Sequence, residues 1–140
     1  MKVLLDTNVL SEPTRPRPDR RVLAWLHEFD EDRVFLSAIS LAEIRRGIVL
    51  MDDGKRRHAL DEWLTHDFAS RFAGRIVSVD QSVALAWGDI MGTANRQGLN
   101  PGTMDCFIAA TAKAHGLILA TRNTRDFSSL GIKVVNPWKD

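Results

Sequence analysis

Short apolar runs alternate along this chain with longer segments of helical spacing, and this alternation is the feature that most limits the fold. Each run is too short for a helix, and most are rich in valine, isoleucine or leucine, as strands buried on both faces are. We predict strands at 2–5, 33–37, 76–79 and 117–121, and a fifth at 132–135. Strands separated by helices favour a parallel sheet covered on both faces, so we predict an α/β fold.

The helical segments carry apolar residues on one stripe and capping residues at their ends. We predict helices at 19–29, 39–51, 55–72, 80–96 and 103–115. Gly116 follows the last of these, where glycine usually ends a helix. Between 11 and 19, Pro13, Pro16 and Pro18 exclude a helix interior and predict an extended loop. No repeat or linker interrupts the pattern, so we expect residues 1–140 to form one domain.

Composition excludes several classes of protein. The net charge of +1 is too small for a protein that binds nucleic acid through bulk charge alone. The single cysteine, Cys106, excludes an internal disulfide and a multi-cysteine metal site, and it lies among apolar residues, so we expect a buried thiol. The start of the sequence shows no signal-peptide pattern, and no apolar run reaches membrane-spanning length. We therefore expect a cytoplasmic protein that does not contact a membrane.

Four acidic residues are predicted at the same edge of the sheet, beyond the carboxyl ends of its strands, which is where ligands bind in such sheets. Asp6 ends the first apolar run, Glu43 follows the second strand, Asp105 opens the helix before the fourth strand, and Asp126 follows that strand. Each acid also has an ordinary structural interpretation. Asp6 and Asp126 suit turns or helix caps, Glu43 suits a capping box with Ser40, and Asp105 suits a helix N-terminus.

Four carboxylates in one pocket repel each other, and their pKa values rise unless a cation compensates. Oxygen ligands without cysteine or a histidine pair suit Mg²⁺ or, as a substitute, Mn²⁺. Such a site can position phosphate oxygens and activate a water for attack. Near these acids, Thr121 and Asn123 supply a hydroxyl and an amide that can hold waters or a carboxylate. Asn8 could support the pocket too, or its side chain could only form hydrogen bonds to backbone groups of a loop. The residues alone thus predict metal-dependent phosphoester chemistry.

Four segments in this order resemble the PIN-domain ribonucleases, in particular the VapC-type toxins of bacterial toxin–antitoxin pairs and their FitB-like branch. They are LLDTNVLSE (4–12), SLAEIRRG (40–47), MDCFIAATAKAHGLILATRN (104–123) and DF (126–127). The resemblance implies a three-layer α/β/α fold with a central parallel sheet of four to five strands. It also implies a Mg²⁺-dependent endoribonuclease that cuts RNA, is inhibited by a cognate antitoxin and forms a homodimer.

By the same resemblance, the four acids correspond to the acidic quartet of that family. Asp6 and Asp105 would be the principal direct metal ligands, and Glu43 and Asp126 would bind a second ion or hold its waters. The polar residues that support such a pocket would be Thr121 and Asn123.

Arg46 is a further candidate because of its spacing from Glu43. A helical residue turns about 100° from its predecessor, so position i+3 returns close to the face of position i, whereas Arg45 should point away. An arginine beside an acidic metal site can steady a scissile phosphate. The alternative is that Arg46 only forms an ion pair with Glu43.

Two rival functions remain open at the level of sequence. A phosphatase with an aspartyl nucleophile would carry D-x-D-x-T after its first strand, but here the sequence is Asp6-Thr7-Asn8, so the second aspartate is missing. A catalytically silent PIN-like scaffold would bind RNA or protein without cutting it. The presence of all four acids argues against the scaffold, and a metal titration of RNA cleavage would separate the two.

Overall fold

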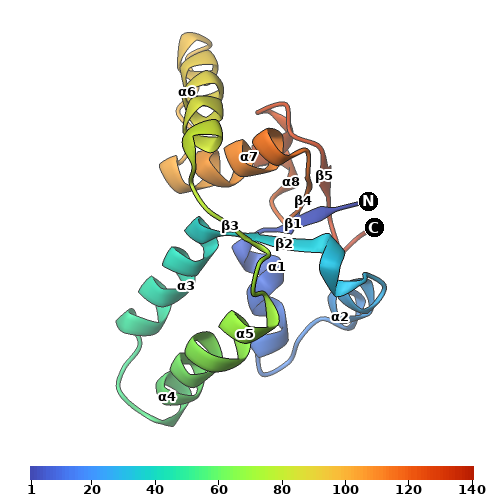
Figure 1. Cartoon of the computed structure of the whole chain (residues 1–140), viewed down its shortest axis with the longest axis vertical. Coiled ribbons are helices and arrows are strands. Elements are labelled where there is room, and N and C mark those ends of the chain that lie inside the picture. The colour runs from blue at the N-terminus through green and yellow to red at the C-terminus, as the bar shows by residue number, and fades with distance from the viewer.

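A five-stranded parallel sheet forms the centre of the protein in the computed structural model, which describes all 140 residues (Figure 1). The strand order is β3-β2-β1-β4-β5, which places β1 in the middle of the sheet. The strands are β1 (Val3–Leu5), β2 (Val34–Ser37), β3 (Ile76–Val77), β4 (Ile118–Ala120) and β5 (Val134–Val135). The predicted α/β class and the five parallel strands are confirmed. Each strand is shorter than the range predicted for it.

Helices cover both faces of this sheet. They are α1 (Thr7–Ser11), α2 (Arg20–His27), α3 (Ala38–Leu50), α4 (Lys55–Glu62), α5 (Ala69–Arg71), α6 (Gln81–Arg96), α7 (Thr103–His115) and α8 (Thr124–Ser128). Figure 1 shows α6, α7 and α8 on one side of the sheet, with α1, α3, α4 and α5 on the other. None of the helices combines the length and the apolar composition that a membrane span requires.

Side chains of the central strand alternate between two hydrophobic cores. Val3 and Leu5 belong to the core under α1 to α5, whereas Leu4 belongs to the core under α6, α7 and α8. Successive side chains of a strand point to opposite faces, so a strand covered on both faces must be apolar at every position. This requirement explains the continuous apolar run at the start of the sequence.

α7 lies close against the sheet through small side chains. Ala109, Ala110 and Ala112 are fully buried, and so is the thiol-bearing Cys106, as predicted from the sequence. The helix ends at the predicted Gly116, whose left-handed backbone (φ 64°) suits glycine because it has no Cβ. This packing fixes the first turn of α7 beside the carboxyl edge of the sheet.

The prediction of an extended loop at 11–19 was wrong in its first part. Ser11 ends α1, and a 3₁₀ turn follows at Glu12–Thr14. Pro13 occupies an early position of this turn, where its missing N–H is not needed as a donor. The proline pattern therefore excluded a longer helix but did not exclude a short turn.

The helix predicted at 55–72 forms, but its middle widens into a π-helical segment at Trp63–Phe68 between α4 and α5. A π turn holds more residues than an α turn, so side chains five apart come together. Trp63 and Phe68 accordingly meet with ring centroids 5.1 Å apart, and Phe68 meets Phe72 at 5.0 Å. The wider turn therefore brings the aromatic rings of this segment together in the core.

Candidate active site

Asp6 lies at the carboxyl end of β1 and is nearly buried, with 5% of its surface exposed. One carboxylate oxygen, Oδ1, accepts a hydrogen bond from the Thr7 backbone N–H (2.8 Å), so Asp6 also caps α1. The other oxygen, Oδ2, accepts one from the Thr121 hydroxyl (2.7 Å) at the end of β4. The cap interpretation and the site interpretation of Asp6 are therefore compatible, because each oxygen retains a free lone pair.

The loop after β4 is tied to the start of α1. Thr121 is fully buried, and its hydroxyl also accepts a hydrogen bond from the Asn123 backbone N–H (3.0 Å). The Asn8 side-chain oxygen accepts one from the Arg122 backbone N–H (3.3 Å). Asn8 thus provides a hydrogen-bond acceptor for the backbone of this loop. It occupies the position where an aspartyl phosphatase would need its second aspartate. Asn123 contributes its backbone to the pocket, whereas its side chain is exposed.

Glu43 reaches the pocket from the second turn of α3, and the predicted capping box with Ser40 was wrong. Ser37, the last residue of β2, caps the helix instead, because its hydroxyl accepts the Ile39 backbone N–H (3.0 Å). The helix therefore begins earlier than predicted. The half-buried Glu43 is free of any capping role and accepts a hydrogen bond from the Thr7 hydroxyl (2.8 Å).

Asp105 lies in the first turn of α7, as predicted for a residue that opens this helix, and Gly102 occupies the N-cap position. Burial raises the pKa of Asp105, and the charges of Glu43 and Asp126 raise it further. All three of these effects raise the pKa, and none lowers it. The carboxylate is consequently left without internal compensation for its charge.

Asp126 is exposed in the first turn of α8 and does not cap that helix, because Asn123 occupies the cap position. The helix begins before Asp126 rather than after it, which corrects the predicted cap. Asp105 and Asp126 both line a hollow of about 350 Å³, whose wall includes Gly102 and the preceding loop. The third and fourth acids thus share one concave surface.

Electrostatic repulsion links all four acids. Burial is the main cause that raises the pKa of Asp6 from 3.8 to about 6, and the charges of Asp105 and Glu43 add to it. The hydrogen bonds from Thr121 and Thr7 act in the opposite direction but do not offset the burial. The structure therefore brings the acids into one charged neighbourhood that a cation would stabilise.

The donor set of this pocket fits a hard divalent cation. No group of three or more acidic, histidine or cysteine side chains is arranged to hold a metal ion by itself. Mg²⁺, however, usually binds one or two carboxylates and completes its shell with water and substrate phosphate oxygens. Asp6 and Asp105 supply two such carboxylates, both with raised pKa values. A pocket of oxygen donors and excess negative charge therefore suits Mg²⁺ or Mn²⁺.

The model of the PIN domain family matches residues 3–133 of this chain. The chain is a PIN-domain protein. Toxin FitB of Neisseria gonorrhoeae is 45% identical to this PIN domain over 138 residues, which are 99% of both chains. The VapC ribonuclease Y4jK of Sinorhizobium fredii is 40% identical over 137 residues, or 98% of both. The crystal structure of FitAcB from Neisseria gonorrhoeae matches this structure with a TM-score of 0.93 and 44% identity, covering 99% of each chain.

The two arginines after Glu43 have different surroundings in this PIN domain. Arg45 forms an ion pair with Asp61 of α4 (2.5 Å), which joins α3 to α4. Arg46 is exposed and takes part in no ion pair, so the alternative pairing of Arg46 with Glu43 is absent. The charge of Arg46 is therefore available to an external anion.

Thr7 is the site residue that sequence reasoning missed. Its backbone N–H binds Asp6 and its hydroxyl binds Glu43, so one residue orients two acids from different elements. A second hydrogen bond joins the Thr7 and Ser40 hydroxyls (3.1 Å), and Ser40 is fully buried. Two features of the sequence could have indicated this role. A threonine directly follows Asp6, and Ser40 lies three residues before Glu43, on the same face of the helix.

Proposed function

We propose that this protein is a Mg²⁺-dependent endoribonuclease, the toxin of a toxin–antitoxin pair, which acts in the cytoplasm and in which residues 1–140 form one PIN domain. The observation that carries the proposal is the cluster of four acids whose repulsion is uncompensated within the protein. The names of the relatives, a toxin and a ribonuclease, support the choice of RNA as substrate and of toxicity as biological role.

Mg²⁺, when bound, would neutralise the acidic cluster, bind phosphate oxygens and lower the pKa of a water that attacks phosphorus. Asp6 and Asp105 would be its direct ligands, and Glu43 and Asp126 would bind a second ion or hold the waters of the first. Mn²⁺ would be a substitute. Thr121 keeps the Asp6 carboxylate in place through the 2.7 Å hydrogen bond.

The remaining residues of the chain supply orientation and charge. Thr7 holds Glu43 at a defined position relative to Asp6, because the same residue binds both. Arg46, which is unpaired, would steady a phosphate at the β2 side of the pocket. Asn8 and Asn123 keep the loop after β4 fixed by the backbone hydrogen bonds described above.

The acidic pocket would also be the place of inhibition. A cognate antitoxin would insert a segment at the pocket mouth, where four carboxylates attract a cationic side chain. We further propose a homodimer, in which two pockets would belong to one longer RNA groove.

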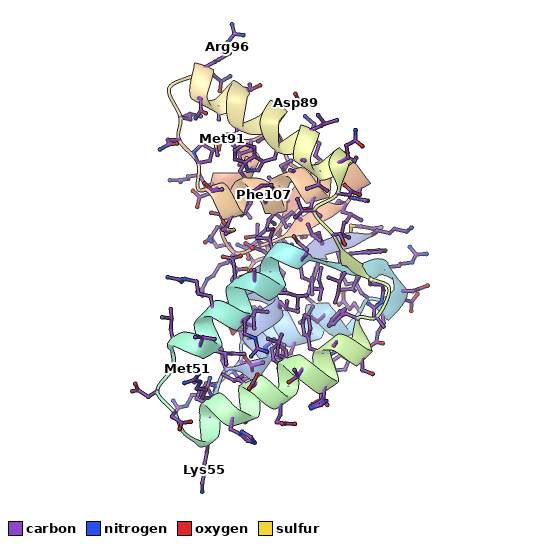
Figure 2. All side chains as sticks on the ribbon, turned by 60° about the vertical axis from the view of Figure 1, so that its left-hand side comes forward. Met51, Lys55, Asp89, Met91, Arg96 and Phe107 are labelled. Atoms are coloured by element: carbon purple, nitrogen blue, oxygen red, sulfur yellow. The ribbon has the colours of Figure 1, made fainter.

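Purified protein incubated with cellular RNA and Mg²⁺, followed by mapping of new RNA 5′ ends, tests this function. Asp105→Asn should lower the rate of RNA cleavage at least about 100-fold while the fold is retained. The substitution removes the charge of a proposed metal ligand but keeps the shape of the side chain. Asp89→Asn is the matched control. Asp89 is exposed on α6, and Figure 2 shows it on the side of the helix that faces away from Phe107 of α7.

Arg46→Ala is compared with Arg45→Ala in the same cleavage assay and in a measurement of antitoxin affinity. We expect Arg46→Ala to lower cleavage and antitoxin affinity, whereas Arg45→Ala should lose only the exposed ion pair with Asp61. Wild-type cleavage by Asp105→Asn would refute the assigned site. Absence of Mg²⁺-dependent cleavage by the wild-type protein would favour the silent scaffold.

A further inference from the structure

Arg122 occupies a fixed position at the edge of the acidic pocket. It directly follows Thr121, whose hydroxyl binds Asp6, and its own backbone N–H binds the Asn8 side chain. The next residue, Asn123, donates its N–H to Thr121. The backbone around Arg122 is therefore held by Asn8 and by Thr121, and Thr121 is also the residue that binds Asp6.

The side chain of Arg122 rests on an aromatic ring. The guanidinium carbon lies 5.1 Å from the centroid of Trp138, within the range of a cation–π interaction. The Trp138 ring is almost buried, with 5% of the residue exposed, and the Trp138 backbone N–H donates to the Asn136 side-chain oxygen (2.9 Å). The Asn136 backbone N–H in turn donates to the Asp140 carboxylate (2.8 Å). Trp138 is thus a rigid platform, and a guanidinium stacked on a ring keeps its N–H edge free for other acceptors.

No carboxylate neutralises this arginine. Four other arginines form ion pairs with aspartate or glutamate, but Arg122 forms none. An exposed cation that is held in place but left unpaired is suited to an external anion. Shielding the edge of Trp138 from water is the alternative role, and it predicts an effect on stability alone.

The strand order places Arg122 and Arg46 after the two strands that flank β1, and so on opposite sides of Asp6. Arg46 belongs to the helix after β2, Asp6 ends β1, and Arg122 follows β4, which pairs with the opposite edge of β1. A nucleic-acid strand that crosses the carboxyl edge from β2 towards β5 would meet one arginine on the β2 side of Asp6 and the other on its β4 side. Arg122 would then contact a phosphate other than the one that is cut.

We propose that Arg122, stacked on Trp138, binds a backbone phosphate of the RNA strand on the β4–β5 side of the pocket. This inference rests on the proposed endoribonuclease function and adds a binding contact to it. A contact to a phosphate positions the strand and carries no information about base sequence. Loss of Arg122 should therefore weaken the binding of all RNA sequences alike.

Arg122→Ala tests the inference with a labelled single-stranded RNA that contains a cleavage sequence mapped for the wild-type protein. We expect KM to rise about three- to tenfold while kcat changes little, because the lost contact lies away from the reacting bond. The slope of log affinity against log salt is negative, and its magnitude, measured in the Asp105→Asn background, should decrease by about 0.7, the value for one phosphate contact on a single strand. Arg122→Lys should restore much of this slope.

Arg33→Ala is the matched control, because Arg33 is exposed, unpaired and located at the amino-terminal end of β2. It should leave KM and the salt slope unchanged. If the wild-type protein cuts no RNA, the proposed function fails before this inference is reached. If the wild-type protein cuts RNA and Arg122→Ala keeps its KM and salt slope, the inference is wrong. Weaker antitoxin binding with unchanged RNA binding would assign Arg122 to the antitoxin instead.

Discussion

Replacement of Asp6 by asparagine should stabilise the protein in the absence of metal. The pKa of Asp6 is raised from 3.8 to about 6, chiefly because the carboxylate is buried. A shift of this size corresponds to about 3 kcal/mol of unfavourable free energy for the ionised form at neutral pH. Asparagine removes the charge and keeps the shape, but it loses one of the two hydrogen bonds at a cost of about 1 kcal/mol. We therefore expect the free energy of unfolding to increase by about 2 kcal/mol at pH 7.5.

The pH dependence of stability provides the more specific measurement. Between pH 3.8 and about 6, the folded protein holds a proton on Asp6 that the unfolded chain has released. The free energy of unfolding of the wild-type protein should thus fall as the pH rises through this range and level off above it. Asp6→Asn should lose most of this decline. Asp105, whose pKa is also raised, should account for part of what remains.

Urea unfolding at several pH values, in the presence of a chelator, measures both effects. Asp89→Asn serves as the control for removal of an exposed carboxylate. Added Mg²⁺ should stabilise the wild-type protein and have little effect on Asp6→Asn, because binding to the folded state adds to stability. An Asp6→Asn variant with native circular dichroism that is no more stable than the wild type at pH 7.5 would refute the reasoning.

Two further predictions concern the pocket and the assembly. Thr7→Val removes the hydroxyl that binds Glu43 while it keeps the branched shape and the N–H that binds Asp6, so cleavage should fall by about tenfold. The fully buried Ser40 also loses its hydrogen bond to Thr7, so the free energy of unfolding should decrease by about 1 kcal/mol. Thr7→Ser should retain activity and stability, and full activity of Thr7→Val would exclude the orienting role. Light scattering at micromolar concentration should give twice the chain mass, and a monomer mass would contradict the proposed dimer.

Local pattern was sufficient to predict most of the secondary structure and the edge of the sheet at which the acids lie. A strand buried on both faces must be apolar throughout, and this requirement made β1 visible in the sequence as a run that ends at Asp6. The end of α7 at Gly116 was equally visible, because a left-handed residue favours glycine. Boundaries were less accurate where two capping residues competed, as Ser37 and Ser40 did at the start of α3.

The sequence by itself predicted that Asp6, Glu43, Asp105 and Asp126 lie at one edge of a parallel sheet, since parallel strands end at a common edge and the helix that returns to β4 begins there. Only the tertiary structure decided how these acids interact. The hydroxyl of Thr7 reaches Glu43 across 36 positions of the chain, and Thr121 reaches Asp6 across 115. The raised pKa of Asp6 likewise depends on burial by elements distant in sequence. Desolvation and side-chain hydrogen bonds act over a few ångströms in space, so a local pattern of residues cannot specify them.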